Sequence, residues 1–169
     1  MQPARRSLLT IGLIAAVAAL ALDQASKFWL LSMFDIAGRG AVRLTPFLDL
    51  VLTWNKGVSY GWFQTTSATG EMILLAVKVA AVIGLGIWLL RAHSALAATG
   101  LGLIIGGAVG NAVDRFTFGA VMDFALFHIE IAGKDRDWYV FNLADVAIVA
   151  GVAALLYDSF VGTTAAKAP

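Results

Sequence analysis

Cysteine is absent from this sequence of 169 residues. Its absence excludes disulfide bonds, thiol catalysis and metal sites built on cysteine ligands. Histidine is scarce too, and neither His93 nor His128 has the His-x-x-x-His or Glu-x-x-His spacing of a zinc peptidase. No serine stands in the Gly-x-Ser-x-Gly motif that marks many serine hydrolases. The common nucleophile and metal signatures of hydrolases are therefore missing.

Charged residues are also few. They make up 14% of the chain, against 60% hydrophobic residues, and the net charge is +1. This composition is too apolar for an ordinary soluble domain and is typical of an integral membrane protein. Because no charge of one sign is in large excess, the composition does not favour binding to nucleic acid. The length suits a single, mainly α-helical domain that covers residues 1–169.

Four apolar stretches predict four transmembrane helices. They cover about residues 7–31, 72–90, 95–113 and 143–161, and each approaches the ~20 residues that cross the hydrocarbon core of a bilayer. The first stretch also has the pattern of a cleavable signal peptide, with Ala19-Leu20-Ala21 as the cleavage site. We expect it to be retained, because its helical pattern continues to Leu31 and the later stretches require membrane insertion anyway.

The distribution of lysine and arginine predicts the orientation in the membrane. Arg5 and Arg6 precede the first stretch, Arg91 lies in the short turn between the second and third, and Lys167 follows the fourth. Positive residues favour the cytoplasmic side, so both termini are expected there. The two longer segments, about residues 35–71 and 114–142, then lie outside, although they carry positive residues of their own.

Both outer segments contain strand-like patterns. Residues 51–54 have strand character and precede a turn at Asn55-Lys56-Gly57, while apolar and polar residues alternate along 127–131. A polar turn, AGKDRD, then leads back to the membrane through WYVF. This return matters because Asp123 and Asp145 are 22 positions apart, or ~33 Å on one continuous helix. A segment that folds back on itself can bring the two aspartates together.

Polar residues within the apolar stretches are candidates for function, because they are costly at membrane depth. Asp23 and Lys27 are four residues apart on the first helix and can pair. The pair either neutralises its own charge at the end of the helix or belongs to a functional site. Lys78 in the second stretch has a long side chain that can reach the interface, so we expect its role to be structural.

The third stretch contains a row of glycines that ends in a polar cluster. Gly102, Gly106 and Gly110 recur every four residues, which allows another helix to pack closely. Three polar residues that follow share one helix face: Asn111, Asp114 and Arg115. This cluster either holds neighbouring helices together or holds a functional group in place.

Two aspartates in apolar surroundings remain as candidates for acid–base chemistry, Asp123 and Asp145. Two adjacent carboxyl groups can share one proton, since ionising both is unfavourable. One can then act as a base on water and the other as an acid on a carbonyl or leaving group. From the residues alone, a proton relay in a small transporter would use the same chemistry.

Taken together, these motifs resemble the bacterial lipoprotein signal peptidases, also called signal peptidase II, a family of membrane aspartyl peptidases. The resemblance covers nearly the whole chain. Five segments carry it, in order: DQASK at 23–27, NKGVSYGWF at 55–63, GGAVGNAVDR at 106–115, VMDF at 121–124 and FNLADVAI at 141–148. Each segment alone is weak, whereas five in order with four spans are highly specific.

The resemblance implies four transmembrane helices with a small periplasmic β-element and a short extramembrane lid. It implies that Asp123 and Asp145 form a catalytic dyad. It assigns ten further residues to substrate binding or support of the dyad: Asp23, Lys27, Asn55, Gly57, Gly110, Asn111, Asp114, Arg115, Asn142 and Ala144. Neither a metal nor an organic cofactor is implied.

The implied activity is that of an endopeptidase. It removes the signal peptide from prolipoproteins, cutting just before a cysteine that carries a diacylglyceryl group. The expected partners are this diacylated prolipoprotein and membrane lipid, with no nucleic acid, and the protein is expected to act as a monomer. Its expected location is the bacterial inner membrane, as a multi-pass protein with its active site toward the periplasm.

Two other classes of function are compatible with a small, apolar helical protein. A transporter would be expected to show an inverted repeat or interrupted helices near the middle of the membrane, and the sequence has neither. A non-catalytic assembly factor built on the glycine row would explain the close packing. It would give no reason for two separately placed aspartates.

Overall fold

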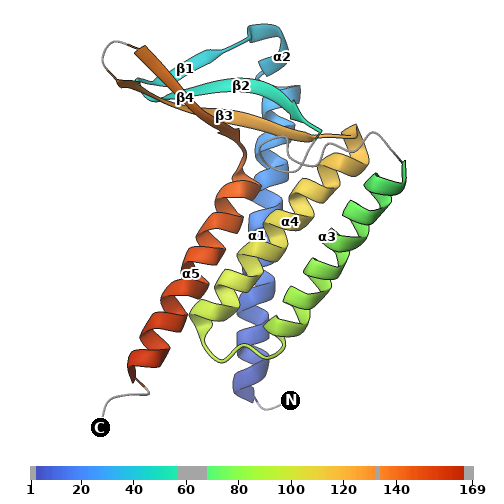
Figure 1. Ribbon diagram of the computed structural model, residues 1–169, viewed down its shortest axis with the longest axis vertical. Helices are drawn as coiled ribbons and strands as arrows, with labels where there is room; N and C mark the ends of the chain where they lie inside the picture. The colour runs from blue at the N-terminus through green and yellow to red at the C-terminus, as the bar shows by residue number, and fades with distance from the viewer. Residues whose placement is uncertain (1–2, 57–67, 132–133, 166–169) are drawn as a thin grey trace.

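The computed structural model describes residues 3–56, 68–131 and 134–165. Four long helices run side by side beneath a small sheet (Figure 1). They are α1 (Pro3–Ser32), α3 (Ala68–Leu89), α4 (Ala95–Phe118) and α5 (Leu143–Ala165). Both termini lie at the end of the bundle opposite the sheet. We refer to these two ends as the sheet end and the terminal end.

Three of the helices are long and apolar enough to cross a membrane. The qualifying segments are Arg6–Ser32 in α1, Ala95–Phe118 in α4 and Leu143–Phe160 in α5. These three segments overlap the predicted first, third and fourth spans, and their length and apolar character indicate a membrane protein. In α3, the apolar segment within the part of the chain that the structure describes is shorter, Val79–Leu89, so the fourth span stays a prediction. α1 passes through Ala19-Leu20-Ala21 without a break.

The third helix continues further than the predicted span. We expected the outer segment to begin at residue 114, but α4 extends to Phe118 and ends at Gly119, whose φ of 72° is in the left-handed region that glycine tolerates. Asp114 and Arg115 therefore belong to the last turns of the helix. At the other end of α4, Ser94 caps the helix by accepting a hydrogen bond from the Ala97 backbone N–H.

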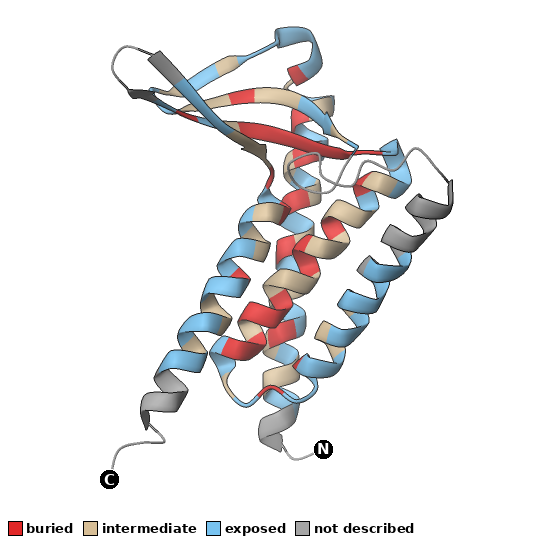
Figure 2. Ribbon diagram, in the orientation of Figure 1, coloured by how far each residue is buried: buried red, intermediate tan, exposed pale blue. Residues whose placement is uncertain are grey.

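α4 is the central helix, and glycine lets two partners approach it on different faces. A Cβ atom added at Gly106 would collide with the Ala16 carbonyl oxygen of α1 and lie 2.9 Å from the Ala19 Cβ. One added at Gly107 would lie 2.5 Å from the Ala144 carbonyl oxygen of α5. The predicted close packing is confirmed toward α1. The second face, toward α5, was not recognised in the sequence. Buried residues accordingly concentrate along α4 and the sides of its neighbours (Figure 2).

The sheet contains four antiparallel strands in the order β1-β2-β3-β4. They are β1 (Val42–Thr45), β2 (Leu48–Asn55), β3 (Val121–Ile131) and β4 (Lys134–Phe141). The predicted strand at 51–54 lies in β2, and the predicted returning segment is the pair β3–β4. We expected two separate extended elements. The structure joins them, because β2 pairs with β3 and places Thr53 opposite Asp123.

A small apolar core fixes the sheet to the helices. Side chains from α1, β2 and β3 form it together with Ile36 from the short helix α2 (Ile36–Arg39): Leu30, Ile36, Leu50, Met122, Phe124 and Ala125. Met122 and Ile36 are almost fully buried. Two residues of the sequence-based predictions, Gly57 and Lys167, lie outside the described residues.

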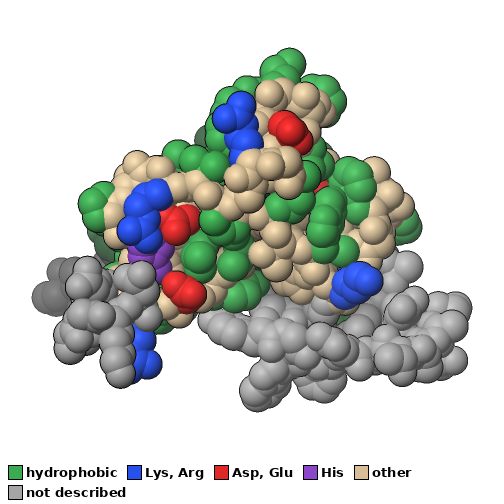
Figure 3. All heavy atoms as spheres, turned by 90° about the horizontal axis from the view of Figure 1, so that it is seen from above, with side chains coloured by type: hydrophobic (Ala, Val, Ile, Leu, Met, Phe, Trp, Pro, Cys, Tyr) green, Lys and Arg blue, Asp and Glu red, His purple; other side chains and the backbone are tan. Residues whose placement is uncertain are grey.

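On the face of the sheet end, the charged side chains that the structure describes do not form a broad patch of one charge sign. Seen from this end, charged side chains among the described residues form small separate groups between hydrophobic ones (Figure 3). One such group is the ion pair between Arg43 of β1 and Asp49 of β2, with a distance of 3.2 Å from Nε to Oδ1. Burial would raise the pKa of Asp49, but the hydrogen bonds with Arg43 and His128 outweigh it and hold that pKa below its ordinary value.

Two matched glycine substitutions test the packing of α4. Gly106→Ala should lower the melting temperature, because its methyl group meets α1 backbone, and overpacking typically costs ~1–3 kcal/mol. Gly86→Ala in α3 should leave the melting temperature unchanged or slightly raised, because its Cβ meets nothing within 4 Å and alanine is the better helix former. Thermal unfolding of the purified variants in detergent measures both. Equal melting temperatures for the two variants would contradict the packing described here.

Candidate active site

Asp123 lies near the start of β3 and is almost fully buried, with 2% of its surface exposed. Two amide side chains donate hydrogen bonds to its carboxyl group. Asn142 Nδ2 bonds Oδ1 at 2.7 Å, and Asn55 Nδ2 from the end of β2 bonds Oδ2 at 3.1 Å. The pairing of β2 with β3 places Asn55 within reach, since Asn55 lies opposite Val121. The structure therefore brings together three residues from three separate sequence motifs.

Asp145 lies in the first turn of α5, where it completes a capping box with Asn142. The Asn142 backbone N–H donates to Asp145 Oδ2 at 3.2 Å, and the Asp145 backbone N–H donates to Asn142 Oδ1 at 3.0 Å. Such reciprocal bonds satisfy backbone donors that the first turn of a helix leaves free. Asn142 and Asp145 are three residues apart, as a capping box requires. This signal was available in the sequence and was missed.

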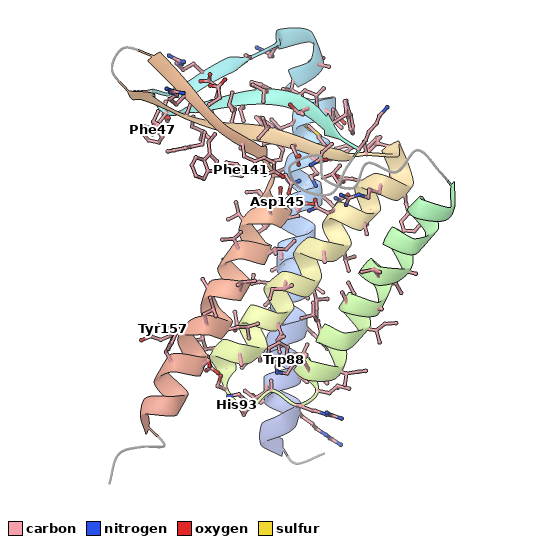
Figure 4. The ribbon with its side chains drawn as sticks, viewed as in Figure 1. Phe47, Trp88, His93, Phe141, Asp145 and Tyr157 are labelled. Atoms are coloured by element: carbon pink, nitrogen blue, oxygen red, sulfur yellow. The ribbon has the colours of Figure 1, made fainter. Side chains whose placement is uncertain are left out.

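Asn142 links the two aspartates. Its side-chain nitrogen donates to Asp123, while its backbone nitrogen donates to Asp145. The same side-chain nitrogen also donates to Asn111 Oδ1 at 3.1 Å, and Asn111 Nδ2 donates to Asp145 Oδ1 at 3.0 Å. Figure 4 shows Asp145 at the upper end of α5, just below the sheet. The Asn142 and Asn111 side chains, hydrogen-bonded to each other, thus connect the carboxyl group of Asp123 to that of Asp145.

The environment of Asp123 favours a bound proton. Burial is the main cause that raises its pKa, and the charge of Asp145 raises it further. Hydrogen bonds from Asn55 and Asn142 act in the opposite direction because they stabilise the charged form. The net result is a pKa of about 6, against 3.8 for an ordinary aspartate. A carboxyl group with such a value can be protonated at a pH where most carboxyl groups are charged.

A buried ion cluster lies directly beside the aspartates. Lys27 Nζ is 2.8 Å from Asp23 Oδ2 and 2.7 Å from Asp114 Oδ2, and all three side chains are at most 4% exposed. The predicted pairing of Asp23 with Lys27 is confirmed. Their pair is part of a cluster that includes a residue of α4, and it contacts the site, because Asp23 Oδ1 accepts a hydrogen bond from the Ala144 backbone N–H at 3.0 Å.

The remaining predicted residues lie around this cluster. Arg115 is half-buried, donates from Nη1 to the Asn111 carbonyl oxygen at 3.2 Å, and interacts electrostatically with both aspartates of the site. Gly110 leaves space for Asp23, because a Cβ there would lie 2.6 Å from Asp23 Oδ2. Ala144 is fully buried at the start of α5. Gly57 lies outside the described residues.

Gln24 also belongs to the cluster, although we did not predict it. Its side-chain nitrogen lies 2.9 Å from Asp114 Oδ1 and 3.1 Å from Asp23 Oδ2. In the sequence it stands directly after Asp23, but an amide next to an acid on a helix is too common to indicate a role. Among the residues that the structure describes, no three acidic or histidine side chains are grouped as metal ligands.

Comparison with known proteins identifies the family. The model of the family "Signal peptidase (SPase) II" matches residues 15–161, which include all the residues described above. The chain belongs to the signal peptidase II family. Its relatives include a protein of Nitrobacter hamburgensis named lipoprotein signal peptidase, which is 69% identical over 94% of this chain and 96% of its own length. Another with this name, from Rhodopseudomonas palustris, is 60% identical over 94% of this chain and 97% of its own.

Solved structures share the fold. A bacterial membrane enzyme structure obtained by the in meso method at 2.3 Å resolution superposes with a TM-score of 0.75, covering 93% of this chain and 91% of the other at 22% identity. A second, at 1.9 Å resolution, gives a TM-score of 0.71 at 23% identity and covers 86% of this chain and 90% of the other. The helical bundle with its sheet is therefore a known membrane-enzyme fold, and signal peptidase II is a family of peptidases.

The Asp123 carboxyl group should titrate near pH 6. Because its pKa in the folded protein is above the ordinary 3.8, its contribution to stability is complete below pH 3.8 and is lost as the pH rises through about 6. Replacing Asn55 by alanine should raise the pKa further, because it removes a donor that stabilises the charged form. Carbon-13 NMR of labelled aspartate measures the titration, with Asp123→Asn to assign the signal. An unchanged or lower pKa in Asn55→Ala would contradict this hydrogen bond.

Proposed function

We propose that this protein is an aspartic endopeptidase that removes the signal peptide from diacylglyceryl-modified prolipoproteins. The observation that carries the proposal is the linkage of Asp123 and Asp145 through Asn142. Membership of the signal peptidase II family supports the peptidase activity, and the names of the relatives support a lipoprotein as the substrate. The proposed cleavage point is the bond just before the lipidated cysteine.

In the proposed reaction, the two carboxyl groups share one proton. The ionised carboxylate removes a proton from a water molecule, and the resulting hydroxide attacks the scissile carbonyl carbon. The protonated carboxyl group gives its proton to the carbonyl oxygen, which leaves a tetrahedral intermediate. When this intermediate collapses, the carbon–nitrogen bond breaks, and the proton taken from water passes to the leaving amine. A hydroxyl group of the intermediate returns its proton to the carboxylate that protonated the carbonyl oxygen, so the pair again shares one proton. The raised pKa of Asp123 favours Asp123 as the acid of the first step, although titration belongs to the pair.

The position of the aspartates suits a substrate that is itself anchored in a membrane. Asp145 lies in the first turn of α5, just below the sheet (Figure 4), and Asp123 lies in strand β3. A signal peptide crosses the membrane as a helix, so its scissile bond would reach such a site at the membrane surface, where water is available. Extended backbone is tolerated there if protein covers it.

We place the sheet end toward the periplasm and the terminal end toward the cytoplasm of the bacterial inner membrane. Arg6 at the start of α1 and Arg91 in the turn between α3 and α4 lie at the terminal end. Short loops with positive residues favour the cytoplasm. Positive residues at the sheet end are in part paired, as in Arg43 with Asp49, or directed at the site, as in Arg115.

Conservative substitutions of the two aspartates test the mechanism. Asp123→Asn and Asp145→Asn should each abolish cleavage of a diacylated prolipoprotein, because asparagine keeps the size of the side chain but cannot accept the proton. The double variant should lose no more cleavage activity than either single variant, since the two aspartates work as one unit. Mass analysis of the product after incubation with purified protein measures cleavage, and thermal unfolding confirms that the variants are folded. Substantial cleavage by either folded single variant would end the dyad assignment.

The lipid on the substrate should dominate recognition. Acyl chains contribute ~0.8 kcal/mol of burial per CH₂ group, so a prolipoprotein without the diacylglyceryl group should be cleaved far more slowly than the same polypeptide with it. The comparison requires matched substrates in the same membrane mimetic and at the same protein concentration. If both substrates are cleaved at the same rate, the protein does not recognise the diacylglyceryl group, and the assignment of a diacylated substrate is wrong.

A further inference from the structure

The two aspartates of the site are placed by two backbone hydrogen bonds of the same kind. The Met122 N–H, one residue before Asp123, donates to Asp114 Oδ2 at 3.0 Å. The Ala144 N–H, one residue before Asp145, donates to Asp23 Oδ1 at 3.0 Å. The start of β3 is therefore held by Asp114, and the start of α5 is held by Asp23. The distance between these two buried carboxylates determines how far apart the two segments begin.

Two side chains of α1 join the carboxylates. Lys27 contacts Oδ2 of both, at 2.8 Å and 2.7 Å. Gln24 uses Nε2 to donate to Asp114 Oδ1 at 2.9 Å and to Asp23 Oδ2 at 3.1 Å. A third acceptor, the Gly110 carbonyl oxygen, lies 3.2 Å from the same nitrogen and ties it to α4.

The two joining groups differ in what they contribute. An ammonium group neutralises charge and rotates freely about its last bond, so it imposes little direction. An amide is planar, and its two N–H bonds point in fixed directions. Gln24 therefore restricts the relative position of Asp23 and Asp114 in a way that Lys27 does not. The absence of a side chain at Gly110 makes this arrangement possible, because a Cβ there would lie 2.6 Å from Asp23 Oδ2.

We propose that Gln24 is a positioning residue for the dyad: by donating to both Asp23 and Asp114, it sets the distance between the start of α5, with Asp145, and the start of β3, with Asp123. The inference rests on the proposed function, in that it gives Gln24 a role in the same reaction. Gln24 acts through the two carboxylates and the backbone that they hold, and it contacts neither Asp123 nor Asp145 in the structure's hydrogen bonds.

Gln24→Met tests the proposal, because methionine keeps the length and much of the shape of glutamine but cannot donate. We expect kcat for prolipoprotein cleavage to fall on the order of 10- to 100-fold, because small misplacements of reacting groups cause losses of this size. KM should stay within about two-fold of the wild-type value, because substrate binding is unchanged. The Asp123 carboxyl group should also titrate at lower pH, because Asp145 moves away from it. Carbon-13 NMR of labelled aspartate measures this titration without requiring turnover.

The control is Ser94→Ala at the opposite end of α4. Ser94 accepts a hydrogen bond from the Ala97 N–H at 2.9 Å and donates to Asp158 Oδ1 at 2.5 Å, so its loss destabilises the same helix far from the site. We expect it to lower the melting temperature while kcat and the Asp123 titration stay as in the wild type. If Ser94→Ala changes kcat and the titration as much as Gln24→Met does, the effect is general destabilisation, and the proposal is overturned.

A folded Gln24→Met protein with wild-type kcat and an unchanged titration would also overturn the proposal. Should this variant fail to fold, Gln24→Asn replaces it, because it keeps an amide but is one methylene too short to reach the same acceptors. It is expected to show the same two changes, and their absence refutes positioning. If the wild-type protein does not cleave a diacylated prolipoprotein, the proposed function fails, whereas the Asp123 titration still decides whether Gln24 positions the carboxyl groups.

Discussion

The structure depends on one buried ammonium group. Lys27 lies between Asp23 and Asp114, and these two carboxylates also accept the backbone hydrogen bonds that begin α5 and β3. Two buried anions without a cation between them would repel each other and would be costly to remove from water. With Lys27 between them, Asp23 accepts a hydrogen bond from the Ala144 backbone N–H, and Asp114 accepts one from the Met122 backbone N–H. One charge on α1 therefore supports the start of the strand and the start of the helix that carry the two aspartates.

Close helix packing is the second requirement, and it follows from where glycine occurs in α4. Gly106 admits the backbone of α1, and Gly107 admits the backbone of α5. Lys27 of α1 and Asp114 of α4 can form a direct ion pair, at 2.7 Å, only if the two helices lie near one another. In a membrane the hydrophobic effect does not draw helices together, so packing and hydrogen bonds must do so. The glycines and the ion cluster therefore act together: the glycines allow the helices to approach, and the ion cluster links them.

The sequence allowed much of this to be predicted, where the signal was local. Apolar length predicted α1, α4 and α5, alternation predicted the segment that returns at β3 and β4, and the motifs marked Asp123 and Asp145. The pairing of β2 with β3 was beyond prediction, because nothing in 51–54 indicates a partner some seventy positions away. Gln24 was missed for a similar reason, since one of its three acceptors lies on the neighbouring Asp23 and the other two, on Gly110 and Asp114, lie on a helix distant in the sequence.

The two aspartates differ because they lie on different kinds of backbone. Asp145 occupies the first turn of a helix, where the Asn142 backbone N–H and the Asn111 side chain donate to it. Asp123 occupies a strand and lies opposite Thr53 of β2. What reaches Asp123 instead are two neutral amides, Asn55 and Asn142, against nearly complete burial. Chemically identical side chains therefore lie in two different environments. The difference arises because one is placed at the start of a helix and the other in a strand of the sheet.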